Sequence, residues 1–122
     1  MAKVDRYKNL DFAIPSSSLA WRIYGKGMEN FGDDKKPDRL DIPGPADDEI
    51  LVRSDAVGLC FSDTKIIKFG SDHPRIQGRN LKKDPVIPGH EVHLTVVKVG
   101  KNRRDQYKRG ERYIIQADVV YK

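Results

Sequence analysis

Apolar and polar residues alternate in two segments of the chain, 50–57 and 91–99, and this pattern predicts two β-strands. Both segments are rich in β-branched residues, and a glycine follows each of them directly, as is common at strand ends. A third strand is expected at 112–121, after the turn signal Arg109-Gly110. Strands therefore outnumber helices, and their connections rich in glycine and proline predict a mainly antiparallel, barrel-like domain.

The remaining segments show weaker patterns. Residues 19–31 predict a first hairpin that turns at the glycine-containing segment 25–27. A short helix is expected at 62–68, and 69–88 is expected to form a loop rich in glycine, proline and basic residues. Residues 1–18 follow neither the helical nor the strand period, and we interpret them as an extended or poorly ordered lead-in.

Composition limits the class of protein. A chain of 122 residues can form one domain with a core, and 38% hydrophobic with 34% charged residues is typical of globular proteins. No apolar run approaches the roughly 20 residues of a membrane-spanning helix, so no membrane partner is expected. The first residues contain no apolar signal-peptide core, and a single thiol fits a reducing compartment, so we expect a cytoplasmic protein.

The net charge of +5 is concentrated in the second half of the chain, where residues 60–122 hold 14 basic and 7 acidic side chains. Such a field attracts anions in general, including nucleic acids and phosphorylated metabolites. A non-enzymatic β-barrel that binds nucleic acid is therefore the alternative function. Residues 64–104 contain Phe69 as their one aromatic residue, whereas stacking on single strands uses several. We therefore expect no nucleic-acid partner.

Two short motifs carry the candidate chemistry, Cys60-Phe-Ser-Asp63 and Pro88-Gly-His90-Glu91. Together they offer a thiolate, an imidazole and carboxylates, all of which are zinc ligands. Cys60 is the only cysteine, which excludes an intrachain disulfide and a four-cysteine structural zinc site, whereas a catalytic zinc needs about three protein ligands. By residue type alone, Cys60 also fits a small buried residue, and His90 a hydrogen-bonded structural one.

Four motifs follow one another along the chain in an order and spacing that are more specific than any one of them. The motifs are 48–63 (DEILVRSDAVGLCFSD), 85–91 (PVIPGHE), 97–100 (VKVG) and 110–112 (GER). Together they resemble the amino-terminal, GroES-like catalytic domain of the medium-chain zinc-dependent alcohol dehydrogenases, over about residues 19–122. Within this family, segments 72–91 and 115–122 look most like the sorbose-phosphate dehydrogenase branch of the polyol group.

The resemblance implies a partly open antiparallel β-barrel with short helices, and a zinc enzyme that oxidises an alcohol, polyol or sugar phosphate with NAD or NADP, or catalyses the reverse. Such enzymes carry a second, nucleotide-binding Rossmann domain and are expected to be homo-oligomers at full length. No strand with a Gly-x-Gly-x-x-Gly turn occurs in this sequence. We therefore expect residues 1–18 to be a lead-in, 19–122 to be the catalytic domain of a longer enzyme, and these 122 residues to be inactive alone.

The resemblance also implies roles for five residues. Cys60 and His90 would hold zinc, and Glu91 is a ligand in enzymes similar to sorbitol dehydrogenase but only lies nearby in others. Because adjacent side chains of a regular strand face opposite ways, His90 and Glu91 reach one metal only if the chain bends there. Ser62 would hydrogen-bond the substrate alcohol and pass its proton outward, and Asp63 would orient His90. The ordinary alternatives are a helix cap for Ser62 and a helix-start carboxylate for Asp63.

Other positions depart from the family pattern or refine it. The family often continues its proton relay with a histidine soon after the cysteine, whereas here none precedes His73, and we interpret His73 and His93 as surface or strand residues. No four-cysteine cluster for a structural zinc follows residue 112. The loop between the two ligand motifs suits a phosphorylated substrate, because arginine and lysine bind phosphate well. Its basic residues are Lys65, Lys68, Arg75, Arg79, Lys82 and Lys83.

Overall fold

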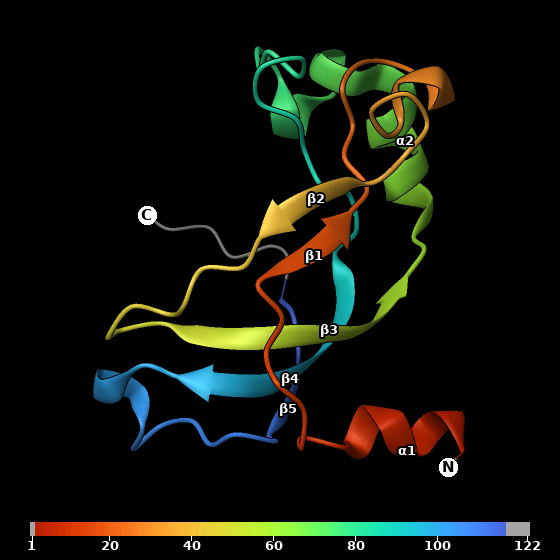
Figure 1. Cartoon of the computed structure of the whole chain (residues 1–122). Coiled ribbons are helices and arrows are strands. Elements are labelled where there is room, and N and C mark those ends of the chain that lie inside the picture. Colours follow the sequence, from red (N-terminus) through yellow and green to blue (C-terminus); the bar gives the residue numbers. More distant parts are fainter. Residues whose placement is uncertain (1, 117–122) are drawn as a thin grey trace. The chain divides into compact units, whose positions relative to one another are not determined.

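The structure, a computed structural model, describes residues 2–116 (Figure 1). Its strands are β1 (Ser17–Ala20), β2 (Asp38–Asp41), β3 (Ile50–Gly58), β4 (Glu91–Val99) and β5 (Arg112–Ile114). The helices are α1 (Lys3–Lys8) and α2 (Phe61–Phe69), with 3-10 turns η1 (Met28–Asn30), η2 (Gly70–Asp72), η3 (Pro74–Ile76) and η4 (Lys101–Arg103). Within the described residues the strands form two antiparallel sheets, β1-β2 and β3-β4-β5, which confirms the mainly β fold class.

The described residues divide into two compact units. The first unit comprises residues 2–16, 42–58 and 90–116 and contains α1 with the three-stranded sheet. The second unit comprises residues 17–41 and 59–89 and contains the two-stranded sheet with α2. Each sheet is therefore built within one unit.

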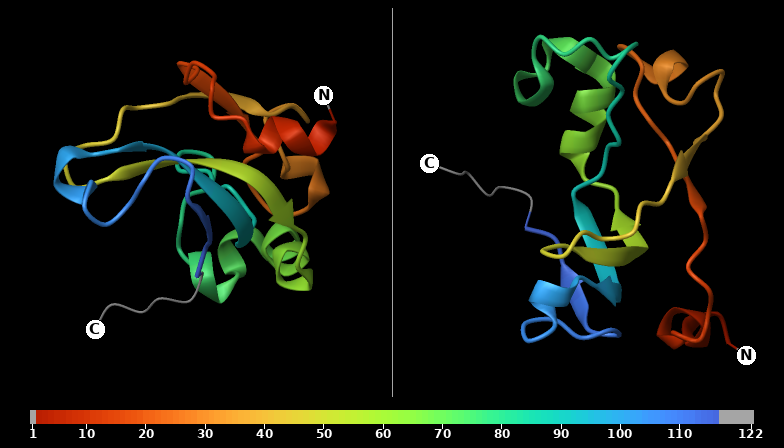
Figure 2. Two further views of the ribbon diagram at one scale, coloured as in Figure 1. Left: turned by 90° about the horizontal axis from the view of Figure 1, so that it is seen from below. Right: turned by 60° about the vertical axis from the view of Figure 1, so that its left-hand side comes forward.

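The three-stranded sheet forms the core of the first unit. β4 lies between β3 and β5, as Figures 1 and 2 show, and its residue Val96 is fully buried. β4 matches the strand predicted at 91–99, and β3 matches the one predicted at 50–57 with one added residue. The third predicted strand ends earlier, at Ile114, and its final part, 117–121, lies outside the described residues.

The pairing of β3 with β4 contains two irregularities. Its register begins at Ile50 opposite Val99 and ends at Gly58 opposite Glu91, with shifts between Leu51 and Val52 and between Ser54 and Ala56. The first shift leaves one extra residue in β4, and the second leaves one extra residue, Asp55, in β3. Alternation of apolar residues predicted both strands but contains no signal for these bulges.

The segment before β1 is more structured than the sequence predicted. Residues 3–8 form α1, a six-residue helix whose start is closed by a hydrogen bond from the Ala2 N–H to the Asp5 carboxylate at 3.1 Å. Arg53 of β3 then donates to the carbonyl oxygens of Tyr7 and Asn9, at 2.5 and 3.2 Å. The prediction of an extended or poorly ordered lead-in was therefore wrong for α1, because long-range contacts to Arg53 supply order that no local period reveals.

Ile23 is the centre of the second unit. Its side chain is fully buried, and its backbone N–H donates to the Val86 carbonyl oxygen at 2.7 Å. Ile23 also forms an antiparallel bridge with Phe31, so the chain does reverse at 25–27 as predicted. The expected return strand at 28–31 is instead mostly the turn η1, because the Asn30 amide donates to the Lys26 carbonyl at 2.7 Å and tightens the reversal. The partner of β1 is β2.

The segment 69–88 was expected to be a loop. Its first residue, Phe69, ends α2, and residues 70–88 contain the short turns η2 and η3 but no α-helix or strand. Leu81 within it is buried and anchors it to the second unit. Of the helices in the described part of the chain, none has the length and apolar character needed to cross a membrane.

Candidate metal centre

Cys60 occupies the N-cap position of α2, directly after the loop that follows β3. Its backbone N–H donates to the Asp63 carboxylate at 3.2 Å, and its carbonyl oxygen accepts the Asp63 N–H at 3.0 Å. These reciprocal contacts close the first turn of the helix and fix the backbone that carries the thiol. The helix predicted at 62–68 is thus confirmed, with one more residue at each end.

His90 and Glu91 follow a sharp bend in the backbone. Gly89 has φ 103°, a conformation that glycine adopts readily and residues with a Cβ adopt rarely. β4 begins only at Glu91, so His90 lies just outside the regular strand. The alternation that would turn adjacent side chains to opposite faces therefore does not apply to His90, and the bend that the sequence analysis required is present.

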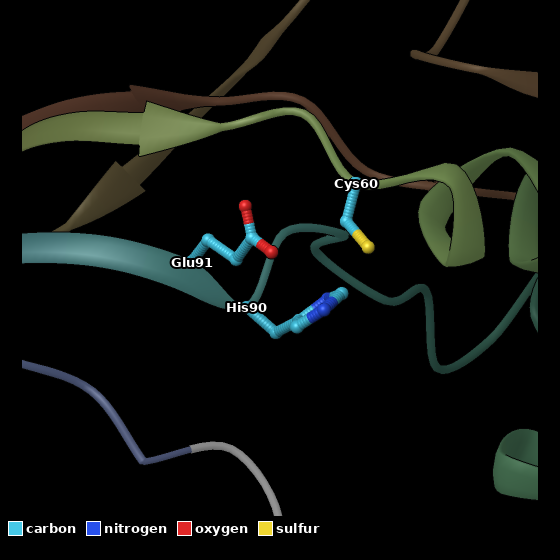
Figure 3. Close-up of side chains that lie close together, drawn as sticks. All are labelled: Cys60, His90 and Glu91. Atoms are coloured by element: carbon cyan, nitrogen blue, oxygen red, sulfur yellow. The ribbon is translucent and has the colours of Figure 1, made fainter.

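Figure 3 shows the side chains of Cys60, His90 and Glu91 pointing toward one another. The Cys60 Sγ, one ring nitrogen of His90 and one carboxylate oxygen of Glu91 all lie within 4.8 Å of each other. Atoms bound to one tetrahedral zinc at about 2.0–2.3 Å lie about 3.3–3.8 Å apart. The donor types suit zinc, and the spacing requires only small side-chain movements to bind it. The three residues therefore fit a site with three protein ligands and an open fourth position.

Gly58 makes room for the Glu91 side chain. The two residues face each other in the register of β3 and β4. A Cβ at position 58 would lie 2.8 Å from Glu91 Oε2 and 3.2 Å from its Cβ, closer than real Cβ contacts normally come. The absence of a side chain at Gly58 therefore allows Glu91 to hold its carboxylate where it does.

Asp63 is a buried carboxylate, with 5% of its surface exposed. Besides the Cys60 N–H, which Oδ2 accepts, its Oδ1 accepts the Gly89 N–H at 3.2 Å. One carboxylate therefore binds the backbone of both segments that carry metal donors. Orientation of the His90 ring by Asp63 stays a prediction, and the two backbone contacts add a positioning role that the sequence did not reveal.

Ser62 lies in the first turn of α2 and is not its N-cap. Its hydroxyl donates to the Cys60 Sγ at 3.3 Å, and the residue is half-buried. The hydroxyl is therefore adjacent to the candidate metal-binding atom of Cys60.

His93, predicted to be a surface or strand residue, lies in β4 and belongs to a polar cluster around Asp55. The Asp55 side chain, 6% exposed, accepts hydrogen bonds from Arg53 at 2.5 Å and from Thr95, and its Oδ2 lies 3.5 Å from His93 Nδ1. Burial would raise the pKa of Asp55, but the hydrogen bonds from Arg53 and Thr95 and the nearby charges lower it below its ordinary value. The signal available in the sequence was a pair of opposite charges two positions apart in a predicted strand, Arg53 and Asp55.

An open hollow of about 360 Å³ lies on the first unit, the one that contains the three-stranded sheet. His90, Glu91 and His93 line it together with Ile114 and Ile115. The hollow therefore combines apolar walls with two of the candidate donors.

His73 has a structural role. Its side chain accepts the Arg75 N–H at the start of η3.

A mainly β domain that gathers a thiol, an imidazole and a carboxylate is a candidate metalloenzyme domain. Residues 46–120 match the alcohol dehydrogenase GroES-like domain, and the chain belongs to this family. The expected resemblance to the amino-terminal domain of medium-chain alcohol dehydrogenases is thereby confirmed.

Several curated relatives are dehydrogenases or reductases of polyols and their phosphates by name. Mannitol-1-phosphate 5-dehydrogenase of Aliivibrio fischeri is 37% identical over 77 residues, which are 63% of this chain and 18% of the relative. L-sorbose 1-phosphate reductase of Klebsiella pneumoniae is 33% identical over 103 residues, or 84% of this chain and 23% of the relative. Sorbitol dehydrogenase of Homo sapiens is 33% identical over 104 residues, which are 85% of this chain and 26% of the relative. The chain thus spans about a quarter or less of the length of these relatives.

Proposed function

We propose that the chain is the catalytic domain of a zinc-dependent dehydrogenase that interconverts an alcohol or polyol and a carbonyl compound with NAD or NADP. The observation that carries this proposal is the convergence of the Cys60, His90 and Glu91 donor atoms within 4.8 Å. Membership of the alcohol dehydrogenase GroES-like family supports it independently.

The residues of this chain would have separate roles at the proposed zinc centre. Cys60, His90 and Glu91 would hold the ion, and zinc, when bound, supplies Lewis acidity toward the reacting oxygen. Ser62 would hydrogen-bond the substrate hydroxyl and relay its proton outward: the serine oxygen would accept the substrate proton while its own hydroxyl proton passes to solvent, since a serine hydroxyl donates and accepts at once. Asp63 keeps the two donor-bearing segments together through the backbone N–H groups that it binds.

A polyol or its phosphate ester is the substrate class that we favour. The names of the relatives support this choice, since they include mannitol 1-phosphate, L-sorbose 1-phosphate and sorbitol. Lys65 and Lys68 of α2, which lie between the two donor motifs, fit a phosphorylated member of this class. The L-sorbose 1-phosphate reductase among these relatives supports the sorbose-phosphate branch that segments 72–91 and 115–122 resemble.

The hydride acceptor would bind outside these residues. We propose that a Rossmann domain elsewhere in the enzyme holds the nicotinamide, because no Gly-x-Gly-x-x-Gly turn occurs in this sequence. The 122-residue chain with zinc and sorbitol or sorbitol 6-phosphate should therefore reduce neither NAD nor NADP. Turnover by the chain alone would overturn this part of the proposal.

Zinc retention tests the centre itself. The chain, loaded with zinc and dialysed, should retain about one ion, while Cys60→Ala and Glu91→Ala should each lose it. The exposed Glu29→Gln serves as a control for removing one negative charge and should keep the ion. Retention by Cys60→Ala, or no retention by the folded wild-type chain, would contradict the three-donor centre.

A further inference from the structure

The second unit contains a hollow that the proposed dehydrogenase chemistry does not use. Its volume is about 620 Å³, within the range of about 300–1,000 Å³ typical of small-molecule sites. Three stretches of the unit line this open hollow, at residues 24–25, 71–72 and 77–82. Figures 1 and 2 show the segment after α2 folded beside the turn that precedes η1.

This hollow lies at the end of α2 that is remote from Cys60. The last turn of α2 contacts the 24–27 turn, where the Gly27 N–H donates to the Ile67 carbonyl oxygen at 2.8 Å. The nine residues of α2 span about 13 Å at 1.5 Å per residue. A six-carbon phosphate ester is too short to reach from a reacting carbon near Cys60 to a phosphate beyond the other end of the helix. The hollow is therefore a separate site and not an extension of the metal centre.

Most of the side chains that line the hollow are polar, with Leu81 as the apolar exception, and several of them are hydrogen-bond donors. Arg79 forms a two-point ion pair with Asp84, at 2.6 and 3.0 Å, which uses two of its five N–H donors and fixes the guanidinium plane. Asn80 accepts the Lys83 N–H through its oxygen, so its amide NH₂ remains as a donor. Gln77 adds both a donor and an acceptor.

The charge of the hollow is positive on balance. Asp72, which lines it, is already engaged by the Lys26 ammonium, and Arg79 is balanced by Asp84. Lys82 also lines the hollow and makes no ion pair with any residue of 2–116. One ammonium group is thus available for an anion, among donors and acceptors that suit hydroxyl groups.

We infer that this hollow binds the phosphate monoester of a small polyhydroxy compound, with Lys82 and Arg79 on the phosphate and Gln77 and Asn80 on the hydroxyl groups. Both cations provide charge-assisted hydrogen bonds to phosphate oxygens. The inference does not depend on zinc or on the proposed dehydrogenase activity.

Backbone amide NMR of the 122-residue chain tests the inference with sorbitol 6-phosphate, sorbitol and inorganic phosphate as ligands. The phosphate ester should produce saturable shifts that are largest in residues 71–82, while sorbitol and inorganic phosphate should each bind more weakly. Shifts that fail to saturate, or that spread over the whole chain, would overturn the site. Equal affinity for inorganic phosphate and the ester would overturn recognition of the hydroxyl groups.

Two adjacent lysines provide a matched pair of variants. Lys82→Ala should weaken binding of the ester about tenfold, the loss expected for one charge-assisted hydrogen bond. Lys83→Ala removes the same charge from an exposed residue that does not line the hollow, and should change the affinity less than about twofold. Equal losses in the two variants would mean that the chain attracts the anion only by its general charge, and would overturn the assignment.

Discussion

The carboxylate of Asp63 accepts the backbone N–H of Gly89 at 3.2 Å, although the two residues are 26 positions apart in the sequence. Its other oxygen accepts the Cys60 N–H at the same distance. The buried side chain thus uses both oxygens on backbone groups next to the candidate zinc ligands. This relationship makes Asp63 a positioning residue for the proposed metal centre.

Asp63→Asn should weaken both folding and metal binding. An amide has one acceptor oxygen, so one of the two backbone N–H groups would face an NH₂ group and lose its partner. We expect the free energy of unfolding to fall by about 1–3 kcal/mol and zinc affinity by about 10–100-fold. Urea unfolding and competition with a zinc chelator measure these two effects. The exposed Asp41→Asn is the control, and equal behaviour of the two variants would refute the positioning role.

Gly89→Ala should be costly because of its backbone conformation. At φ 103° a Cβ introduces strain of about 1–3 kcal/mol, and relaxation of that strain would move His90. Gly44→Ala provides the matched control, since a Cβ there meets nothing within 4 Å and its φ is not positive. Thermal unfolding of both variants, with zinc retention, checks the expectation. Similar stability in the two variants would show that the bend at Gly89 tolerates a side chain.

Gly58→Ala tests whether Glu91 is a zinc ligand. The added Cβ would push the Glu91 side chain aside, so zinc affinity should fall about tenfold or more while the fold is retained. In a background that already carries Glu91→Ala, the same substitution should have little further effect on zinc. Zinc competition assays on the four proteins of this cycle give the coupling. Additive losses would indicate that Glu91 does not bind the ion.

Asp55 predicts a specific dependence of stability on pH. Because the pKa of Asp55 in the folded chain is lowered, its contribution is fully present above its unfolded pKa of about 3.9 and is lost as the pH falls through the folded value. Wild type should therefore exceed Asp55→Asn in stability at pH 6, and the difference should shrink below about pH 4. Urea midpoints between pH 3 and pH 7 measure this difference.

Asp84→Asn is the comparison for the Asp55 prediction. The Arg79 guanidinium lowers the pKa of Asp84 as well, but this ion pair is exposed and screened by solvent. Its removal should change stability little at any pH. A stability difference between wild type and Asp55→Asn that stays constant from pH 3 to pH 7 would mean that the Asp55 charge does not stabilise the fold.

The strands β3 and β4 and the helix α2 could be predicted from sequence because their signals are local. Alternation in 50–57 and 91–99 predicted the strands, and the glycines that follow mark their ends. Burial itself does not alternate in β4, where Thr95, Val96 and Val97 are buried in a row. α1 and the β1-β2 pairing could not be predicted in this way. α1 has six residues and no apolar stripe, and its carbonyl groups find donors in Arg53, far along the chain.

The metal donors could be proposed from residue type, but their arrangement could not. Nothing in the order of Cys60, His90 and Glu91 reveals that Gly58 leaves space for the carboxylate. The roles of Asp63 also depend on backbone groups, which carry no residue identity, so a sequence pattern has no access to them. The 620 Å³ hollow could not be predicted from sequence for a related reason, since it is formed by loops whose shape follows from packing around Leu81.

The two bulges between β3 and β4 act as compensating changes of length. One strand gains a residue near Val97 and the other gains Asp55, so both ends keep the same pairing offset, from Ile50 opposite Val99 to Gly58 opposite Glu91. Deleting either extra residue alone would slide the far end by one position and turn Glu91 away from the gap at Gly58. The two strands are therefore constrained as a pair, and homologous domains that change the length of one strand while keeping the carboxylate in place must change the other to match.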